Sequence, residues 1–148
     1  MKIYLDACCL NRPFDDQFQD RVRLESEAIL LIIKHFENRD WTWFGSEVLN
    51  YELEQIPDLD RWQKVRLLTK YVHTVVVLDL EIISRAQQLE ALGFKAFDAL
   101  HIACAEKAGA DVFLTTDNHI LHLSDRFSNQ LKIKLNNPLV WFHEVIKE

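Results

Sequence analysis

The chain has 148 residues, of which 49% are hydrophobic and 27% charged, and its formal net charge is −6. This apolar content excludes an intrinsically disordered chain, and three glycines and three prolines are too few for a loop-rich β-sandwich. The acidic balance argues against a simple basic nucleic-acid coat protein. It does not exclude a nuclease, because carboxylates at a metal site count as negative in this sum.

The N-terminal segment, Met-Lys-Ile-Tyr-Leu-Asp, lacks the apolar core of a signal peptide. No apolar run approaches the roughly 20 residues that a membrane-spanning helix needs. Cys8, Cys9 and Cys104 show no C-x-x-C spacing, which favours neither a disulfide framework nor a zinc site. We therefore expect a cytoplasmic protein whose cysteines are small buried side chains.

Hydrophobic periodicity predicts strands that alternate with helices along the whole chain. The expected strands cover residues 2–5, 41–44, 74–78, 111–115 and 131–135. The expected helices cover residues 21–36, 47–56, 61–72, 79–92, 95–108, 118–123 and a terminal segment from 138, and residues 11–20 read as a polar loop. This alternation predicts one α/β domain over residues 1–148, with three α/β/α layers around a parallel sheet of four to five strands.

Two aspartates follow predicted strands. Asp6 ends the first strand and Asp117 follows the fourth. Ligands of open parallel sheets bind beyond the carboxyl ends of the strands, so both residues are candidates for a functional site. Aspartate is also common in ordinary turns, which is the alternative for each of them.

Glu52 lies inside the apolar stripe of its predicted helix, four residues after Val48 and four before Ile56. A lone carboxylate on such a face costs several kcal/mol unless it is paired or binds a metal. The pattern therefore leaves two interpretations open, a metal-site acid or an ion pair with Arg66 or Arg21.

Asp98 lies at the start of an alanine-rich helix, where the helix dipole favours a carboxylate and would also aim it at a cation. His101 follows one turn later. A lone histidine at such a position is more often a packing or hydrogen-bonding residue than a metal ligand.

The order and surroundings of these four acids resemble the PIN-domain family of metal-dependent ribonucleases. The matching segments are Ile3-Tyr4-Leu5-Asp6, the Ser-to-Glu segment 46–53, the segment 97–103 around Asp98, and Leu114-Thr115-Thr116-Asp117. The chain departs from the family pattern at Cys8, where a hydroxyl or amide side chain is frequent.

The resemblance implies a PIN-like fold and metal-assisted hydrolysis of RNA with Mg²⁺ or Mn²⁺, ions that prefer hard oxygen ligands. Asp6 and Asp98 would be the main metal ligands. Asp117 would bind the ion directly or through water, and Glu52 would hold a water of the ion's shell or a second ion. Thr115 could orient a carboxylate by hydrogen bonding.

The resemblance to VapC-type toxins also implies an RNA substrate, a small antitoxin protein as partner and a homodimer. Arg12 and Lys95 could contact phosphates, although each could equally be a solvated charge. Some of the four tryptophans could belong to an interface and others to the core.

The alternative function is a non-catalytic PIN-like scaffold. A haloacid-dehalogenase phosphatase needs a second aspartate where Cys8 stands, and a receiver domain needs an acidic pair, so both fit poorly.

Overall fold

The structure is a computed structural model that describes residues 1–147. Its five-stranded sheet is parallel throughout and has the order β3-β2-β1-β4-β5. The strands are β1 (Lys2–Leu5), β2 (Thr42–Ser46), β3 (Thr74–Val76), β4 (Val112–Leu114) and β5 (Lys134–Asn136). The predicted parallel α/β sheet is therefore confirmed.

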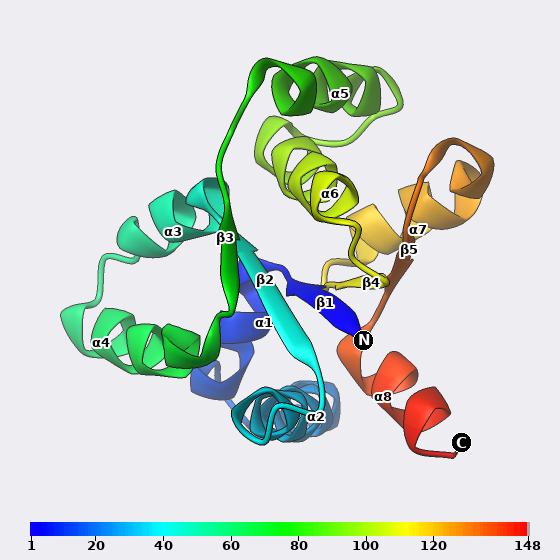
Figure 1. The fold of residues 1–148 in the computed structure, drawn as a ribbon. Coiled ribbons are helices and arrows are strands. Elements are labelled where there is room, and N and C mark those ends of the chain that lie inside the picture. Colours follow the sequence, from blue (N-terminus) through cyan, green and yellow to red (C-terminus); the bar gives the residue numbers. More distant parts are fainter. Residues whose placement is uncertain (148) are drawn as a thin grey trace.

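Helices cover both faces of this sheet (Figure 1). They are α1 (Ala7–Asn11), α2 (Asp20–Glu37), α3 (Glu47–Glu54), α4 (Leu59–Leu68), α5 (Leu80–Ala91), α6 (Ala96–Ala108), α7 (Asn118–Arg126) and α8 (Pro138–Ile146). Short 3₁₀ helices, η1 (Arg12–Phe14), η2 (Thr69–Tyr71) and η3 (Ser128–Gln130), lie between them.

The two apolar cores lie on opposite faces of the sheet because strand side chains alternate in direction. Ile3 and Leu5 of β1 join a cluster built with α1, α2, α4 and α8. Tyr4 and Phe113 point the other way, into a cluster with α5, α6 and α7. Helix α3 contributes to both clusters, since Leu49 belongs to the first and Val48 to the second.

The expected elements differ from the structure mainly at their ends and in the first loop. Residues 11–20 are not simply a loop, because η1 lies within them, and α1 was not expected. The last strand is shifted to Lys134–Asn136, and α3 ends at Glu54, before Pro57. Gly93 and Gly109 have the positive φ values of 116° and 70° that suit the ends of α5 and α6.

The tryptophans divide between core and partly covered positions. Trp43 and Trp141 are buried, whereas Trp41 and Trp62 are half-buried. Trp41 packs edge-on against Trp141, with ring centroids 5.1 Å apart. Within residues 1–147, no helix combines the length and apolar character needed to cross a bilayer.

Candidate metal centre

The carboxyl ends of β1 and β4 meet at the point where the chain reverses its direction of travel across the sheet. From β1 the chain continues outward to β2 and β3, and then returns to the other side for β4 and β5. Such a switch point opens a crevice in parallel sheets. Asp6 follows β1 and Asp117 follows β4, so the topology brings these two predicted residues to the same edge.

Asp6 is buried and held by several donors. Its Oδ1 accepts from the backbone N–H of Ala7 at 2.9 Å and so caps α1. Its Oδ2 accepts from the Thr115 hydroxyl at 2.8 Å, which confirms that Thr115 orients a carboxylate. The Thr115 Oγ1 in turn accepts from the backbone N–H of Asp117 at 3.1 Å. One threonine thus joins the loops that carry both aspartates.

Asp117 is the N-cap of α7. Its Oδ1 accepts from the backbone N–H groups of His119 and Ile120 at 2.8 and 3.4 Å. The Arg21 guanidinium donates to the carbonyl of Thr116 at 2.8 Å and to Asn118 Oδ1 at 3.0 Å. The residues on both sides of Asp117 are therefore anchored from α2.

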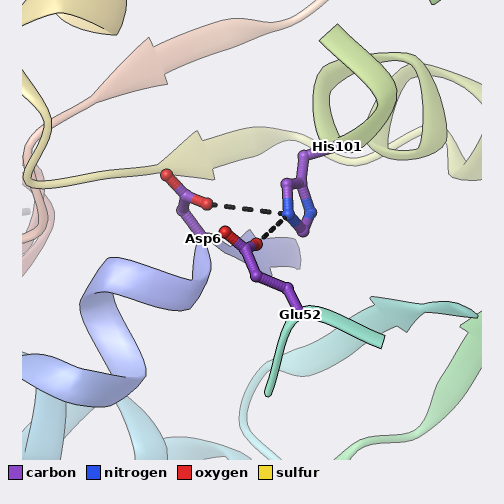
Figure 2. A group of neighbouring side chains, drawn as sticks. All are labelled: Asp6, Glu52 and His101. Atoms are coloured by element: carbon purple, nitrogen blue, oxygen red, sulfur yellow. Dashed lines mark hydrogen bonds and ion pairs between the residues drawn. The ribbon is translucent and has the colours of Figure 1, made fainter. Parts of the chain in front are cut away.

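Glu52 reaches the site from α3, beside β2, and meets His101 from α6 (Figure 2). The Nε2 of His101 lies 2.6 Å from Glu52 Oε2 and 4.0 Å from Asp6 Oδ1. One potential ligand atom from each of these three residues lies within 4.8 Å of the others, a spacing that could hold a metal ion.

The partner of Glu52 is thus His101, and the expected alternative of an arginine partner is wrong. Arg21 pairs with Glu25 instead, with 3.1 Å between Arg21 Nε and Glu25 Oε2. The Arg66 guanidinium lies over the Trp62 ring, 5.0 Å from its centroid. The Glu52 side chain is not fully buried, since 37% of it is exposed.

Asp98 lies in the first turn of α6, where the sequence predicted it, and is half-buried. Burial, together with the negative charges of Asp6 and Asp117, raises the pKa of Asp98 to about 6 from its ordinary 3.8. Burial is the larger cause of this shift, and the neighbouring carboxylates add to it while His101 acts in the opposite direction.

We call Asp6, Glu52, Asp98 and Asp117 the acid cluster. Throughout residues 1–147, no lysine or arginine lies within ion-pair distance of these four carboxylates, and their ion pairs involve His101 alone. Several carboxylates that share one edge without a fixed cation suit a hard divalent ion, which prefers oxygen ligands. The residues present therefore fit Mg²⁺ or Mn²⁺.

Cys8 fills the place where the family often has a hydroxyl or an amide. Its Sγ lies 3.4 Å from Asp6 Oδ2 and 3.3 Å from Thr115 Oγ1, and it accepts from the backbone N–H of Thr116 at 3.3 Å. The thiol therefore takes part, as a weak polar group, in the contacts that support Asp6.

The two cations considered for phosphate contacts have different surroundings. Arg12 Nη2 lies 2.8 Å from Glu25 Oε1 and its Nη1 lies 3.4 Å from Asp15 Oδ2, so its charge is already paired. Lys95 is exposed at the residue before α6 begins.

His101 was not among the predicted site residues, although hydrogen bonding was the expected role for it. The structure confirms that role, because Nδ1 lies 2.7 Å from the Tyr4 hydroxyl while Nε2 contacts Glu52. Burial lowers the pKa of His101, but the hydrogen bond to Glu52 and the charge of Asp6 outweigh it, and the net shift is upward. One feature of the sequence could have indicated that His101 belongs to the site. His101 follows Asp98 by three residues, which places both on the same face of the helix.

Comparison with known proteins agrees with this architecture. The family model described as PIN domain matches residues 3–125. No curated protein matches the chain. Among solved structures, one of VapBC2 from Rickettsia felis is similar, with a TM-score of 0.59 and 14% identity over 93% of this chain and 98% of that one. In that structure VapBC2 is bound to a DNA fragment from its promoter.

FitAcB from Neisseria gonorrhoeae is similar with a TM-score of 0.60 and 14% identity, over 92% of this chain and 97% of that one. A structure of FitAB bound to an IR36 DNA fragment gives a TM-score of 0.59 at 14% identity, over 93% and 95% of the two chains. At this identity these similarities establish the fold.

Proposed function

Because the chain belongs to the PIN domain family, we propose that it is a metal-dependent endoribonuclease that hydrolyses RNA phosphodiester bonds. The observation that carries this proposal is the acid cluster at the switch point of the sheet, where four carboxylates have no lysine or arginine partner within residues 1–147. The pKa of Asp98 is raised to about 6, first by burial and then by the charges of Asp6 and Asp117, and such shifts are frequent at functional sites.

In this proposal Asp6 and Asp98 are the principal ligands of Mg²⁺ or Mn²⁺. Asp117 assists from the N-cap of α7, and Glu52 assists from α3. The bound ion would act as a Lewis acid on the phosphodiester and its attacking water. Thr115 holds the Asp6 carboxylate in place through its 2.8 Å hydrogen bond.

The test is cleavage of a fluorescently labelled single-stranded RNA by the purified protein with Mg²⁺ or Mn²⁺, and with EDTA. We expect cleavage that needs the ion and that falls by at least about 100-fold in Asp6→Asn and Asp98→Asn, since each variant removes a ligand charge. Glu54→Gln and Asp125→Asn are matched controls, because these acids are exposed on α3 and α7.

Two results would contradict the assignment. One is cleavage by Asp6→Asn or Asp98→Asn at the wild-type rate, and the other is cleavage that persists in EDTA. If the wild-type protein neither cleaves RNA nor responds to Mg²⁺, as followed by tryptophan fluorescence, the alternative of a non-catalytic scaffold is favoured instead.

We further propose that the protein is the toxin of a toxin–antitoxin pair and acts in the cytoplasm as a homodimer. Support comes from the family and from the fold shared with the VapBC2, FitAcB and FitAB structures. Expression alone should arrest growth, and co-expression of a small protein encoded by a neighbouring reading frame should restore it. Growth that is unaffected by the wild-type protein would contradict a toxin role, and light scattering would report the oligomer.

A further inference from the structure

A line of hydrogen bonds runs from the end of β2 through the interior to the acid cluster. Ser46 Oγ lies 2.6 Å from the Tyr4 hydroxyl, and that hydroxyl lies 2.7 Å from His101 Nδ1. On the other side of the ring, His101 Nε2 lies 2.6 Å from Glu52 Oε2 (Figure 2). Ser46, Tyr4 and His101 are completely buried, whereas Glu52 is partly exposed.

The chemistry at the two ends gives this line a direction. The backbone N–H of Leu49 donates to Ser46 Oγ at 3.0 Å, so the serine hydroxyl hydrogen remains free to point at Tyr4. When the imidazole is neutral, Tyr4 can then donate to His101 Nδ1. In the neutral ring and in the imidazolium alike, Nε2–H donates to Glu52, since an ionised carboxylate only accepts. In this direction every buried donor and acceptor of the line has a partner.

The opposite direction is unfavourable. With the ring hydrogen on Nδ1 alone, the Nε2 lone pair would face a carboxylate oxygen at 2.6 Å. An ion bound to both atoms would not remove the conflict. Two adjacent octahedral ligands at 2.0–2.1 Å from Mg²⁺ lie about 2.9 Å apart, which exceeds the distance between these two atoms.

We propose that His101 is a positioning residue whose Nε2–H holds the Glu52 carboxylate toward the cation, with Tyr4 and Ser46 fixing the imidazole ring, and that His101 is not itself a metal ligand. This inference rests on the proposed metal site. Glutamate has three side-chain torsions and Glu52 is partly exposed, so without this donor its carboxylate would lose entropy on binding the ion. A buried donor that fixes a ligand typically changes metal affinity by about 10–100-fold.

The first experiment asks whether a histidine nitrogen binds the ion directly. Mn²⁺ is bound to the wild-type protein, and electron spin echo envelope modulation measures coupling of the ion to ¹⁴N, with ¹⁵N-histidine labelling to assign it. We expect no coupling of the strength that a directly bound imidazole gives. A histidine coupling that disappears in His101→Gln would overturn the proposal.

The second experiment measures Mn²⁺ affinity and RNA cleavage in variants of the line. His101→Leu removes the donor, and we expect a 10–100-fold weaker Mn²⁺ affinity and a lower kcat with KM for RNA little changed. His101→Gln places an amide N–H near the position of Nε2, and we expect recovery to within about threefold of wild type. Tyr4→Phe should fall between these two, because the ring loses its anchor.

The control is Ile102→Ala, a core truncation next to His101 on α6, where Ile102 is fully buried. We expect it to lower the melting temperature without weakening Mn²⁺ binding, which separates positioning from stability. Unchanged Mn²⁺ affinity in both His101→Leu and Tyr4→Phe would overturn the proposal, as would a wild-type protein that binds no Mn²⁺. Mn²⁺ binding that depends on His101 in a protein that cleaves no RNA would refute only the ribonuclease.

Discussion

This protein has a buried carboxylate, Glu25, that is paired with arginines, and a second group of carboxylates, the acid cluster, that is not. The Glu25 cluster consists of Glu25, Arg12, Arg21 and Asn137. Glu25 is only 1% exposed, and its oxygens lie 2.8 Å from Arg12 Nη2, 3.1 Å from Arg21 Nε and 2.5 Å from Asn137 Nδ2. The acid cluster has only His101 as an ion-pair partner within residues 1–147.

The difference shows that burial alone does not tell a structural carboxylate from one at a functional site. A buried carboxylate is tolerated when the chain supplies its counter-charge, as in the Glu25 cluster, and such a group belongs to the scaffold. The acid cluster has no lysine or arginine within ion-pair distance among residues 1–147, and the charges of Asp6 and Asp117 add to the effect of burial in raising the pKa of Asp98. Arg21 connects the two groups, because it contacts Glu25 and also the residues on each side of Asp117.

The largest expected effect comes from breaking the Glu25 cluster. Glu25→Ala should lower the free energy of unfolding by about 3–5 kcal/mol, because it leaves a largely buried Arg12 without its main counter-charge. Urea denaturation measures this loss. Glu27→Ala, an exposed acid on the same helix, should change stability by less than about 0.5 kcal/mol. A loss below about 1 kcal/mol in Glu25→Ala would mean that the cluster is not structural.

The second effect is stabilisation of the folded protein by a metal ion bound at the acid cluster. Mn²⁺ at 100 times its dissociation constant should raise the free energy of unfolding by about 2.7 kcal/mol, because the ion binds the folded state. Thermal melts with and without Mn²⁺ measure the gain. Asp6→Asn should lose most of this gain, whereas Asp125→Asn should keep it. Equal stabilisation of wild type and Asp6→Asn would place the ion elsewhere.

The third effect is a gain in stability on removal of a carboxylate, Asp98, whereas the first is a loss. Asp98 has an ordinary pKa of 3.8 and a folded pKa of about 6, so the folded state binds the proton more tightly. Without metal, this group therefore makes the wild-type protein less stable as pH rises from about 4 to about 6, and the loss stays at higher pH.

Asp98→Asn removes that penalty and should stabilise the metal-free protein at pH 7.5 by about 1 kcal/mol, a value discounted for the partial exposure of the side chain. Urea denaturation at pH 4 and pH 7.5 checks this. The free energy of unfolding of the variant should exceed that of wild type only at pH 7.5. An Asp98→Asn variant that is less stable than wild type at pH 7.5 would show that the carboxylate is compensated after all.

The smallest effect concerns the residue that links the two groups. Arg21→Ala should lower the free energy of unfolding by about 0.5–1 kcal/mol, because this side chain is 45% exposed. Glu25 would still have Arg12 and Asn137 as partners. Hydrogen exchange should also become faster in the backbone around Asp117, where Arg21 anchors Thr116 and Asn118. Arg12→Ala should cost more, since only 19% of that side chain is exposed. The reverse order would mean that Arg21 is the main partner of Glu25.

Much of the fold was predictable because apolar periodicity and strand ends are local signals. The five strands, the helices between them and the positions of Asp6 and Asp117 at strand ends all follow from such patterns. Helix α1 was not predictable in this way. Its five residues are too few for a periodic pattern, and the sequence offered Asp6 as a site residue or a turn residue but not as the cap of a helix.

The candidate site was predictable in its acids but not in the contacts that hold them. The hydrogen bond between Tyr4 and His101 joins residues 97 positions apart, and no spacing along the chain predicts it. The partner of Glu52 was missed for the same reason. The position of Glu52 on an apolar helix face predicted either an ion-pair partner or a metal, but only the packing of α6 against α3 and β1 brings a histidine to it.

The first strand of the chain is the central strand of the sheet, and its aspartate depends on a threonine 109 positions later. During synthesis, Asp6 therefore leaves the ribosome long before Thr115 and Asp117 exist to complete its surroundings. A nascent chain has all four carboxylates of the acid cluster only after β4 and Asp117 have been made. Translation that is interrupted before that point releases fragments with an incomplete acid cluster, so the order of the strands itself delays the formation of the site.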